Sequence, residues 1–356
     1  MKNYYIIPIF VPHEGCPHDC VFCNQGKITG ENKEKVKGPK NKIENKVDKN
    51  FVIKTVEEYL QTINKKNSII EISFFGGTFT AVDINKQKEL LSVAKSYKDK
   101  GIINYIRLST RPDYINDFIL TYLKEYGVDI IELGVQSLDR EVLEKSGRGH
   151  GVEEVKMASK LINDYRFTLG HQIMVGLPGD TEEKDIYTAK MSIEMKPKIC
   201  RIYPALTIKD TPMEDMYLKK RYIPYTLEEA LGICEKIYKM YKEKDINVIR
   251  IGLQPTDNIT EGKDVIAGPF HPAFRELVES KSLNNEIYNI FKRDKGNIVI
   301  KINNRRISKL YAGKKMFFNE LKSSIIPNLL DVIIDNSLEL NTVCVNINNE
   351  LYKIYI

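Results

Sequence analysis

The chain alternates two kinds of segment from its start to about residue 255, and this alternation restricts the fold more than any other feature. Short apolar runs rich in β-branched residues indicate buried strands, and the segments between them have the period of helices. We place strands near residues 4–10, 69–75, 103–109, 129–135, 168–175 and 198–203, with a seventh candidate at 246–251. The connections are long enough for right-handed crossovers between parallel strands. We therefore expect an α/β fold, a partial (β/α)6 TIM-like barrel.

The pattern changes beyond residue 256. Strand-like runs there flank apolar stretches of helical period, which is typical of a small α+β unit. The strand-like runs lie at 297–302, 342–348 and 351–355, and the helical stretches lie near 306–322 and 325–334. We predict a core barrel at residues 1–255 and a small C-terminal α+β region at residues 256–356, with substrate or RNA binding as the role to test there.

Composition and cysteine usage indicate the cell compartment. No stretch reaches the eighteen or more apolar residues of a membrane span, and the N-terminus lacks the pattern of a signal peptide. Six cysteines, three of them within eight residues, do not resemble the disulfide framework of a secreted protein. We expect a cytoplasmic protein with reduced thiols and no membrane partner.

Cys16, Cys20 and Cys23 follow the first predicted strand, at the end of the sheet where barrel enzymes have their active sites. A cubane iron–sulfur cluster has four irons, so three thiolates leave one iron open for an exogenous ligand. Structural zinc is the main alternative, but such sites close with a fourth Cys or His, which here would have to be His18. The spacing favours an oxygen-sensitive 4Fe–4S cluster that takes part in chemistry.

The segment from Gly15 to Cys23 resembles the radical S-adenosylmethionine (SAM) superfamily, whose signature is a CxxxCxxC loop with an aromatic residue before the third cysteine, here Phe22. The resemblance implies an enzyme with a 4Fe–4S cluster and SAM as cofactors. SAM would bind the open iron through its amino and carboxylate groups, and one-electron reduction would cleave it to methionine and a 5′-deoxyadenosyl radical. The electron would come from a donor such as flavodoxin or ferredoxin.

Two further strand ends match the family. Gly76, Gly77 and Thr78 follow the second strand and are similar to the glycine pair that contacts the SAM amino group through its backbone. Arg111 follows the third strand, and its guanidinium could bind a carboxylate of SAM or of the substrate through two parallel hydrogen bonds. A helix-capping or surface role is the alternative for Arg111.

Residues after the fourth and fifth strands complete the implied SAM site. By resemblance, Gln136 and Ser137 would contact the ribose or methionine part, and the strand end from Met174 to Leu177 would pack on adenine. The turn that follows Leu177 also makes a good helix N-cap, which needs no ligand. The sequence identifies no residue that acts on the substrate.

Within the superfamily, the pattern is most similar to the radical SAM half of the catalytic subunit of the Elongator complex and its archaeal and bacterial relatives. The resemblance covers about residues 5–245 and rests on residues 110–114, 133–137, 147–150 and 202–208. It implies an RNA substrate, with tRNA as the first candidate. Nothing after residue 256 resembles that family's acetyltransferase domain, so acetyl-dependent modification of the wobble uridine does not carry over.

Two other functions stay open. One is a small-molecule radical reaction like that of oxygen-independent coproporphyrinogen oxidase, although that enzyme has a further cysteine where this chain has Gln25. The other is a non-catalytic RNA-binding protein with a structural iron–sulfur cluster, against which the open iron argues.

One basic segment of the C-terminal region suits a polyanion such as RNA. Residues 292–322 contain ten lysines and arginines against only Asp294 and Glu320. Within this segment, residues 307–315 resemble the loop of a KH module, but the Gly-x-x-Gly pattern of that loop is incomplete because only Gly313 is present. A solvated lysine-rich surface is the alternative.

Overall fold

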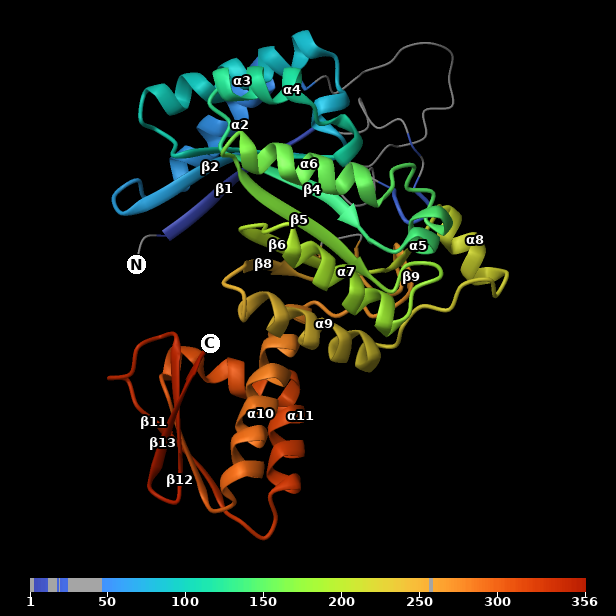
Figure 1. Cartoon of the computed structure of the whole chain (residues 1–356). Helices are drawn as coiled ribbons and strands as arrows, with labels where there is room; N and C mark the ends of the chain where they lie inside the picture. The colour runs from blue at the N-terminus through green and yellow to red at the C-terminus, as the bar shows by residue number, and fades with distance from the viewer. Residues whose placement is uncertain (1–2, 12–17, 19, 25–46, 256–258) are drawn as a thin grey trace. The chain divides into compact units, whose positions relative to one another are not determined.

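The structure, a computed structural model, describes residues 3–11, 18, 20–24, 47–255 and 259–356 (Figure 1). The chain forms two compact units. The first consists of Met1–Thr226 and Met240–Phe270, and the second of Leu227–Lys239 and His271–Ile356.

A seven-stranded parallel sheet in the order β1-β2-β3-β4-β5-β6-β8 forms the centre of the first unit. The strands are β1 (Asn3–Phe10), β2 (Ser68–Phe75), β3 (Tyr105–Thr110), β4 (Ile130–Gln136), β5 (Thr168–Val175), β6 (Ile199–Pro204) and β8 (Asn247–Ile251). Each strand pairs with the next main-sheet strand along the chain, as repeated crossovers of one hand require. The predicted partial barrel is confirmed, with the seventh candidate strand included. A short antiparallel pair, β7 (Thr207–Ile208) and β9 (Val265–Ala267), follows the sixth strand.

Helices connect the strands, and most of them lie where the helical period predicted. They are α2 (Lys49–Thr62), α3 (Ile84–Asp99), α4 (Asp117–Glu125), α5 (Arg140–Lys145), α6 (Val152–Asp164), α7 (Glu182–Glu194), α8 (Pro212–Leu218) and α9 (Leu227–Lys242). The short helix α8 was not predicted. The side chains of Asp83, Asn116 and Thr181 accept hydrogen bonds from backbone N–H groups in the first turns of α3, α4 and α7, which satisfies donors that the helix itself cannot pair. None of the helices in the described ranges is long and apolar enough to cross a membrane.

The register of the sheet brings the carboxyl ends of the strands together. Phe10 at the end of β1 lies opposite Phe75 at the end of β2, and Thr110 at the end of β3 lies opposite Leu133 in β4. Residues that follow these strands therefore meet at one edge of the sheet, although they are far apart in the sequence.

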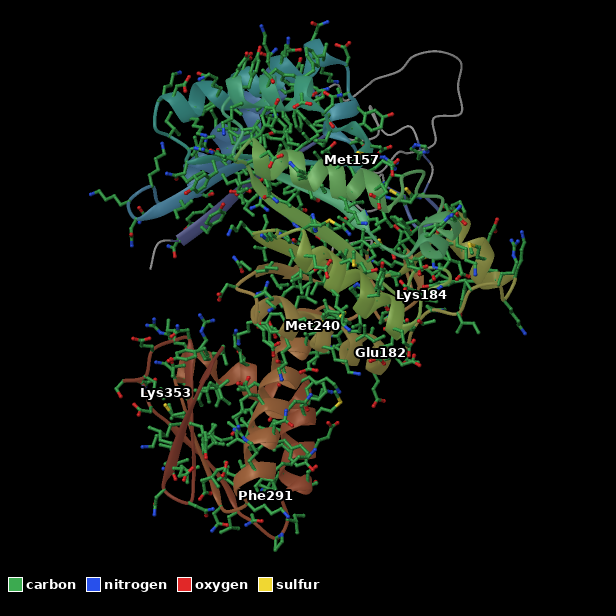
Figure 2. All side chains as sticks on the ribbon, in the orientation of Figure 1. Met157, Glu182, Lys184, Met240, Phe291 and Lys353 are labelled. Atoms are coloured by element: carbon green, nitrogen blue, oxygen red, sulfur yellow. The ribbon has the colours of Figure 1, made fainter. Side chains whose placement is uncertain are left out.

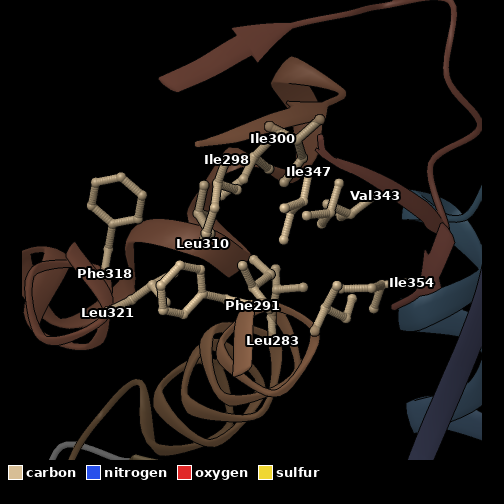
Figure 3. Close-up of a cluster of buried hydrophobic side chains, with 14 of the residues drawn as sticks. Leu283, Phe291, Ile298, Ile300, Leu310, Phe318, Leu321, Val343, Ile347 and Ile354 are labelled. Carbon is tan, nitrogen blue, oxygen red and sulfur yellow. The ribbon is translucent and has the colours of Figure 1, made fainter. Parts of the chain in front are cut away.

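The second unit contains a four-stranded sheet with two helices packed against it, and it also includes the Leu227–Lys239 part of α9. Its other elements are α10 (Phe274–Asp294), β10 (Ile298–Ile302), α11 (Ile307–Ser324), β11 (Leu330–Ile334), β12 (Thr342–Ile347) and β13 (Glu350–Tyr355). The sheet order is β11-β10-β12-β13, with β10 and β11 parallel and the other pairs antiparallel. Figure 3 shows its core, in which Phe291 of α10 and Leu310 of α11 lie beside Ile300 and Val343 of the sheet.

The predicted helix near 325–334 is wrong, because a strand, β11, occupies its second half. Pro327 interferes with helix continuation, and the run from Leu330 to Ile334 is rich in β-branched residues that extend a parallel strand beside β10. Helix α10 was not predicted, since its middle carries many Ser and Asn residues of low helix propensity. Helix α11 lies where expected but has non-helical backbone from Ala312 to Lys315.

Candidate functional site

A cavity of ≈ 750 Å³ opens at the carboxyl edge of the large sheet. Eight of the residues that the sequence nominated line it: Cys20, Cys23, Phe22, Gly76, Gly77, Thr78, Arg111 and Gln136. Ser137 and Met174 are not among its lining residues, and Cys16 lies outside the described residues. The fold thus brings residues at the carboxyl ends of β1, β2, β3 and β4 together in one cavity.

The backbone holds the cysteine loop at this edge from two sides. Cys20 is buried, Cys23 is partly exposed, and neither is in a disulfide. The N–H of Val21 donates to the carbonyl of Ser146 at 3.1 Å, and the N–H of Met213 donates to the carbonyl of Val21 at 2.9 Å. The loop is therefore tied both to the end of α5 and to the start of α8.

Phe22 anchors the loop through its ring. The ring packs against a buried apolar cluster of Val142, Leu177 and Ala205, which Met174 also contacts. Burial of an aromatic ring is worth a few kcal/mol, so this contact restrains the position of the neighbouring Cys23.

Arg148 is the residue that sequence reasoning missed in this site. It is 6% exposed, and its NH1 group donates a hydrogen bond to the sulfur of Cys20 at 3.3 Å. Its NH2 group donates to the carbonyl of Gly134 at 2.7 Å, and its Nε has no partner among the described residues. The Gly-Arg-Gly-His segment at 147–150 was visible as a family match, but nothing local indicated that its arginine meets a cysteine.

Two glycines make room for the Arg148 segment. A Cβ atom on Gly134 would lie 2.8 Å from the NH2 group of Arg148, and a Cβ atom on Gly149 would lie 2.5 Å from the His18 ring. Gly149 also has a φ of 76°, which suits glycine. Any side chain at either position would push the arginine or the cysteine loop away.

Gly76 and Gly77, the glycine pair after β2, have backbone dihedral angles that glycine adopts more readily than other residues. Gly76 has φ 92° and Gly77 has φ 120°, a region that L side chains rarely adopt. Val11 donates its N–H to the carbonyl of Phe75 at 2.7 Å, so the chain after β1 runs beside this turn. The backbone of the pair is accessible to a ligand in the cavity.

Arg111 is already paired within the chain. Its Nε and NH2 groups donate to the two carboxylate oxygens of Asp113, both at 2.9 Å, which leaves NH1 without a partner among the described residues. Burial raises the pKa of Asp113, but the hydrogen bonds and charge of Arg111 outweigh it and hold that pKa below its usual value. Burial and the charge of Arg148 lower the pKa of nearby His150 to about 3, so this imidazole is neutral.

An amide pair closes the far side of the cavity. Gln136, at φ 66° after a bulge in β4, exchanges two hydrogen bonds with Gln172 of β5, at 3.1 and 2.8 Å. Ser137 is 1% exposed, and its hydroxyl lies 3.2 Å from that of Thr188 in α7. The amides of Gln136 and Gln172 face the cavity, whereas Ser137 is engaged elsewhere.

An ion-pair network crosses the sheet beneath the cavity. Arg107 pairs with Glu71 at 2.6 Å and with Glu132 at 3.2 Å, and Arg201 pairs with Glu132 at 2.9 Å. Arg201 also lies over the ring of Phe75, 5.0 Å from its centre. The sequence contained one signal of this network, since Glu71 interrupts the apolar run of β2.

A second ion pair fastens the loop between β5 and α7. Lys184, labelled in Figure 2, donates to Glu141 of α5 at 2.6 Å and to the carbonyl of Gly179 at 2.8 Å. The loop that follows Met174 and Leu177 is thus held by α5 and by the first turn of α7.

The donor set fits an iron–sulfur cluster with SAM bound to it. Thiols of Cys20 and Cys23 are soft iron ligands. The buried Nε of Arg148, which no described residue pairs, suits a carboxylate, and the turn at Gly76 and Gly77 permits close backbone approach.

Two family models match most of the first unit. Residues 10–191, which are 182 of the 356 residues, match the model described as the radical SAM superfamily. Residues 197–283 match the model described as the radical SAM C-terminal domain.

Two curated relatives have similar sequences. A tRNA uridine(34) acetyltransferase of Methanocaldococcus jannaschii is 30% identical in an alignment 255 residues long that covers 64% of this chain and 47% of the relative. Elongator complex protein 3 of Bos taurus is 26% identical in an alignment 200 residues long that covers 51% of this chain and 37% of the relative. The chain therefore spans less than half the length of these two curated relatives.

A solved structure has a similar fold. It is the archaeal Methanocaldococcus infernus Elp3 with an N-terminal deletion, with a TM-score of 0.58 at 20% identity. The similarity covers 82% of this chain and 63% of that one. At 20% identity, this similarity is evidence for the fold alone.

Proposed function

Because this chain belongs to the radical SAM superfamily, whose enzymes use a 4Fe–4S cluster and SAM, we propose that it cleaves SAM reductively in order to modify RNA, with tRNA as the first substrate to test. The observation that carries the proposal is the convergence of Cys20, Cys23, the Gly76–Gly77 turn and Arg148 on one cavity. The name of the Methanocaldococcus jannaschii relative, a tRNA uridine(34) acetyltransferase, supports the choice of tRNA.

We propose Cys16, Cys20 and Cys23 as the cluster ligands. When bound, the cluster supplies the electron that cleaves SAM. Arg148 stabilises negative charge on the Cys20 sulfur through its hydrogen bond. Packing of Phe22 and the backbone bonds of Val21 hold the loop in place, which limits its movement into solvent.

Arg148 is also our choice for the SAM carboxylate. The sequence suggested Arg111, but the carboxylate of Asp113 already neutralises the charge of its guanidinium. The bonded groups of Arg148 meet a thiol and a backbone carbonyl, which carry no formal negative charge, and its Nε has no partner in the described ranges. The Gly76–Gly77 turn would orient the amino group, and Thr78 lies beside this turn in the cavity lining.

The remaining SAM contacts stay proposals. Gln136, together with Gln172, presents an amide to the cavity and suits the ribose hydroxyls. Met174 packs against the same apolar cluster as Phe22 and would border the adenine. Ser137 would act by supporting the turn that carries Gln136, because its own hydroxyl already meets Thr188.

The other lining residues of the cavity suit a nucleotide. Phe10, Tyr59 and Tyr203 contribute aromatic rings, and Arg250 brings positive charge. Bases stack on aromatic rings and arginines, and an enzyme that modifies a base takes it out of the stack into its pocket. A cavity of ≈ 750 Å³ is in the range of sites for ligands of this size.

We further propose that residues 1–255 carry the radical chemistry and that residues 256–356 assist substrate binding. An electron donor such as flavodoxin or ferredoxin and a cytoplasmic location complete the proposal, since a 4Fe–4S cluster needs a reductant and protection from oxygen.

The test is anaerobic reconstitution with iron and sulfide, followed by dithionite and SAM. We expect 5′-deoxyadenosine from the wild type and none from Cys20→Ala or Cys23→Ala. Cys344→Ala, which removes a buried cysteine of the second unit, is the matched control and should retain the product. Release of no product from a protein with an intact cluster would exclude SAM cleavage.

Unmodified tRNA then tests the substrate. We expect tRNA to increase 5′-deoxyadenosine release and to yield a nucleoside of changed mass after digestion. Product that forms equally well without RNA, with no new nucleoside, would reject the RNA substrate and favour a small-molecule reaction.

A further inference from the structure

Helix α11 of the second unit is interrupted by an exposed loop. Its first half ends at Tyr311 and its second half begins at Met316, and the residues Ala312–Lys315 between them are non-helical. We call these four residues the α11 loop. They lie beyond the residues that the two family models match.

The neighbouring helix α10 is built to hold this interruption. The carbonyl of Leu310, which the broken helix leaves without its usual partner, accepts hydrogen bonds from Ser280 at 3.2 Å and from Asn284 at 3.1 Å. Both donors are buried in α10, at 0% and 3% exposure. The loop is therefore a defined part of the fold.

Two lysines occupy backbone positions that favour glycine. Lys314 has φ 55° and Lys315 has φ 67°, in the left-handed region that costs L side chains free energy. Both side chains are exposed, so neither gains the burial that would offset the strain. Residues held in such positions are more often selected for function than for stability.

Positive charge is concentrated around the loop without matching carboxylates. In the described part of the second unit, Lys314, Lys315 and Lys322 make no ion pair. Lys315 lies over the ring of Tyr311, 4.5 Å from its centre, on the helix half before the loop. Exposed lysines without carboxylate partners suit the phosphates of a nucleic acid strand.

The position of the loop between two helix halves has a counterpart in KH modules. The loop joins two helix halves that connect the parallel neighbours β10 and β11. KH modules clamp the backbone of a single strand with a glycine-containing loop. Leu310, Phe318 and Leu321 of α11 are in the unit's own core (Figure 3). Met316 is the exposed large apolar residue of this helix, so α11 offers little apolar area to a lipid surface.

We propose that the α11 loop binds the sugar–phosphate backbone of single-stranded RNA, with Lys314 and Lys315 as phosphate contacts. This binding goes beyond the radical chemistry and does not require it.

The test measures binding of a labelled single-stranded RNA of about 12 nucleotides to the full reconstituted chain as salt is varied. We expect Lys314→Glu/Lys315→Glu to weaken binding by about tenfold or more at 0.1 M salt. It should also reduce the slope of log K against log salt by about 1.4, because each phosphate contact on a single strand contributes about 0.7.

A second variant excludes misfolding as the cause. Lys314→Gly/Lys315→Gly removes the charges and relieves the backbone strain, so it should raise the melting temperature of the second unit by about 2 to 4 °C. It should nevertheless weaken RNA binding. The matched control is Lys219→Glu/Lys220→Glu, an exposed lysine pair at the end of α8 in which Lys220 also has a positive φ, 55°.

Four results would overturn the proposal. The first is wild-type RNA affinity in both loop variants, and the second is an equal loss of RNA affinity in the α8 control. The third is equal affinity of the wild type for duplex RNA of the same length. The fourth is binding of the wild type to phosphatidylserine vesicles but not to RNA. Release of 5′-deoxyadenosine in the absence of RNA should be unchanged in the loop variants, so failure of RNA binding and failure of SAM cleavage are measured separately.

Discussion

The guanidinium of Arg148 donates a hydrogen bond to the sulfur of Cys20 over 3.3 Å, although 128 residues separate the two along the chain. The contact joins the loop after β1 to the turn between α5 and α6. A charged donor at this distance stabilises negative charge on its acceptor. Arg148 is thereby placed to serve the cysteine and a ligand of the cavity at once.

Replacing Arg148 by Met should weaken SAM binding by about 10- to 100-fold, because a charged hydrogen bond to a carboxylate is worth about 1.5 to 3 kcal/mol. The measurement is calorimetric titration of the reconstituted protein with SAM. Arg140→Met in the neighbouring α5 is the control, since its side chain is 90% exposed and its ion pair lies on the surface. An unchanged Kd together with a loss of bound iron would show that Arg148 serves only the cysteine.

Replacing Gly134 by Ala should weaken SAM binding as the Arg148 substitution does, although Arg148 itself is retained. The new methyl group would lie 2.8 Å from the NH2 group of Arg148, and overpacking of this kind costs about 1 to 3 kcal/mol. We expect weaker SAM binding and a lower melting temperature.

Gly232→Ala provides the comparison for Gly134, because a Cβ atom at this helical position in α9 would meet nothing within 4 Å. It should stabilise the protein by about 1 kcal/mol. Equal effects of the two alanines would contradict the steric argument at Gly134.

Replacing Glu132 by Gln should destabilise the first unit by about 3 to 5 kcal/mol, since it leaves two buried guanidiniums without their shared carboxylate. The side chains of Glu132, Arg107 and Arg201 are only 6%, 4% and 12% exposed. Urea denaturation measures the loss. Glu144→Gln, whose partner is the exposed Arg140, should change stability by at most about 0.5 kcal/mol.

Asp185 should make the stability of the first unit dependent on pH. It is buried and accepts hydrogen bonds from Gly176 N–H at 3.3 Å and from Tyr225 at 3.1 Å. Burial, and then the neighbouring Asp180, raise the pKa of Asp185 to about 10 from its usual 3.8, and burial raises the pKa of Asp180 to about 6. The folded state therefore retains protons that the unfolded state releases.

The sign of the effect follows from these raised pKa values. Stability from Asp185 is complete below pH 3.8 and is lost as the pH rises toward 10. The melting temperature should fall from pH 5 to pH 9 in the wild type and fall less in Asp185→Asn, whose neutral amide needs no proton. Parallel curves for the two proteins would refute this prediction.

Much of the first unit could be predicted from local pattern. The strands and most of their helices lie where the periodicity indicated, and the family resemblance is confirmed by the matched models. In the second unit the same reasoning failed at β11, since a short apolar run reads equally as strand or helix until a partner strand is known.

Within the candidate site, the sequence located the residues near each strand end but not their contacts. It suggested that the guanidinium of Arg111 binds a carboxylate of SAM or of the substrate. In the structure, two groups of that guanidinium donate to Asp113, two residues further along. It assigned no role to Arg148, and it did not anticipate the network that joins Glu71 to Arg201 across the sheet. Each of these depends on which side chains of different strands face each other.

The sequence by itself determined the parallel α/β architecture, the cysteine spacing and the glycines at the strand ends, because period, spacing and backbone freedom are local properties. Only the tertiary structure decided which arginine meets Cys20 and where α11 breaks. Those outcomes depend on the register between strands and on buried partners such as Asn284, which lies 26 residues from the carbonyl that it caps. Buried polar groups must find partners wherever the fold places them, and their positions follow from the packing of the whole unit.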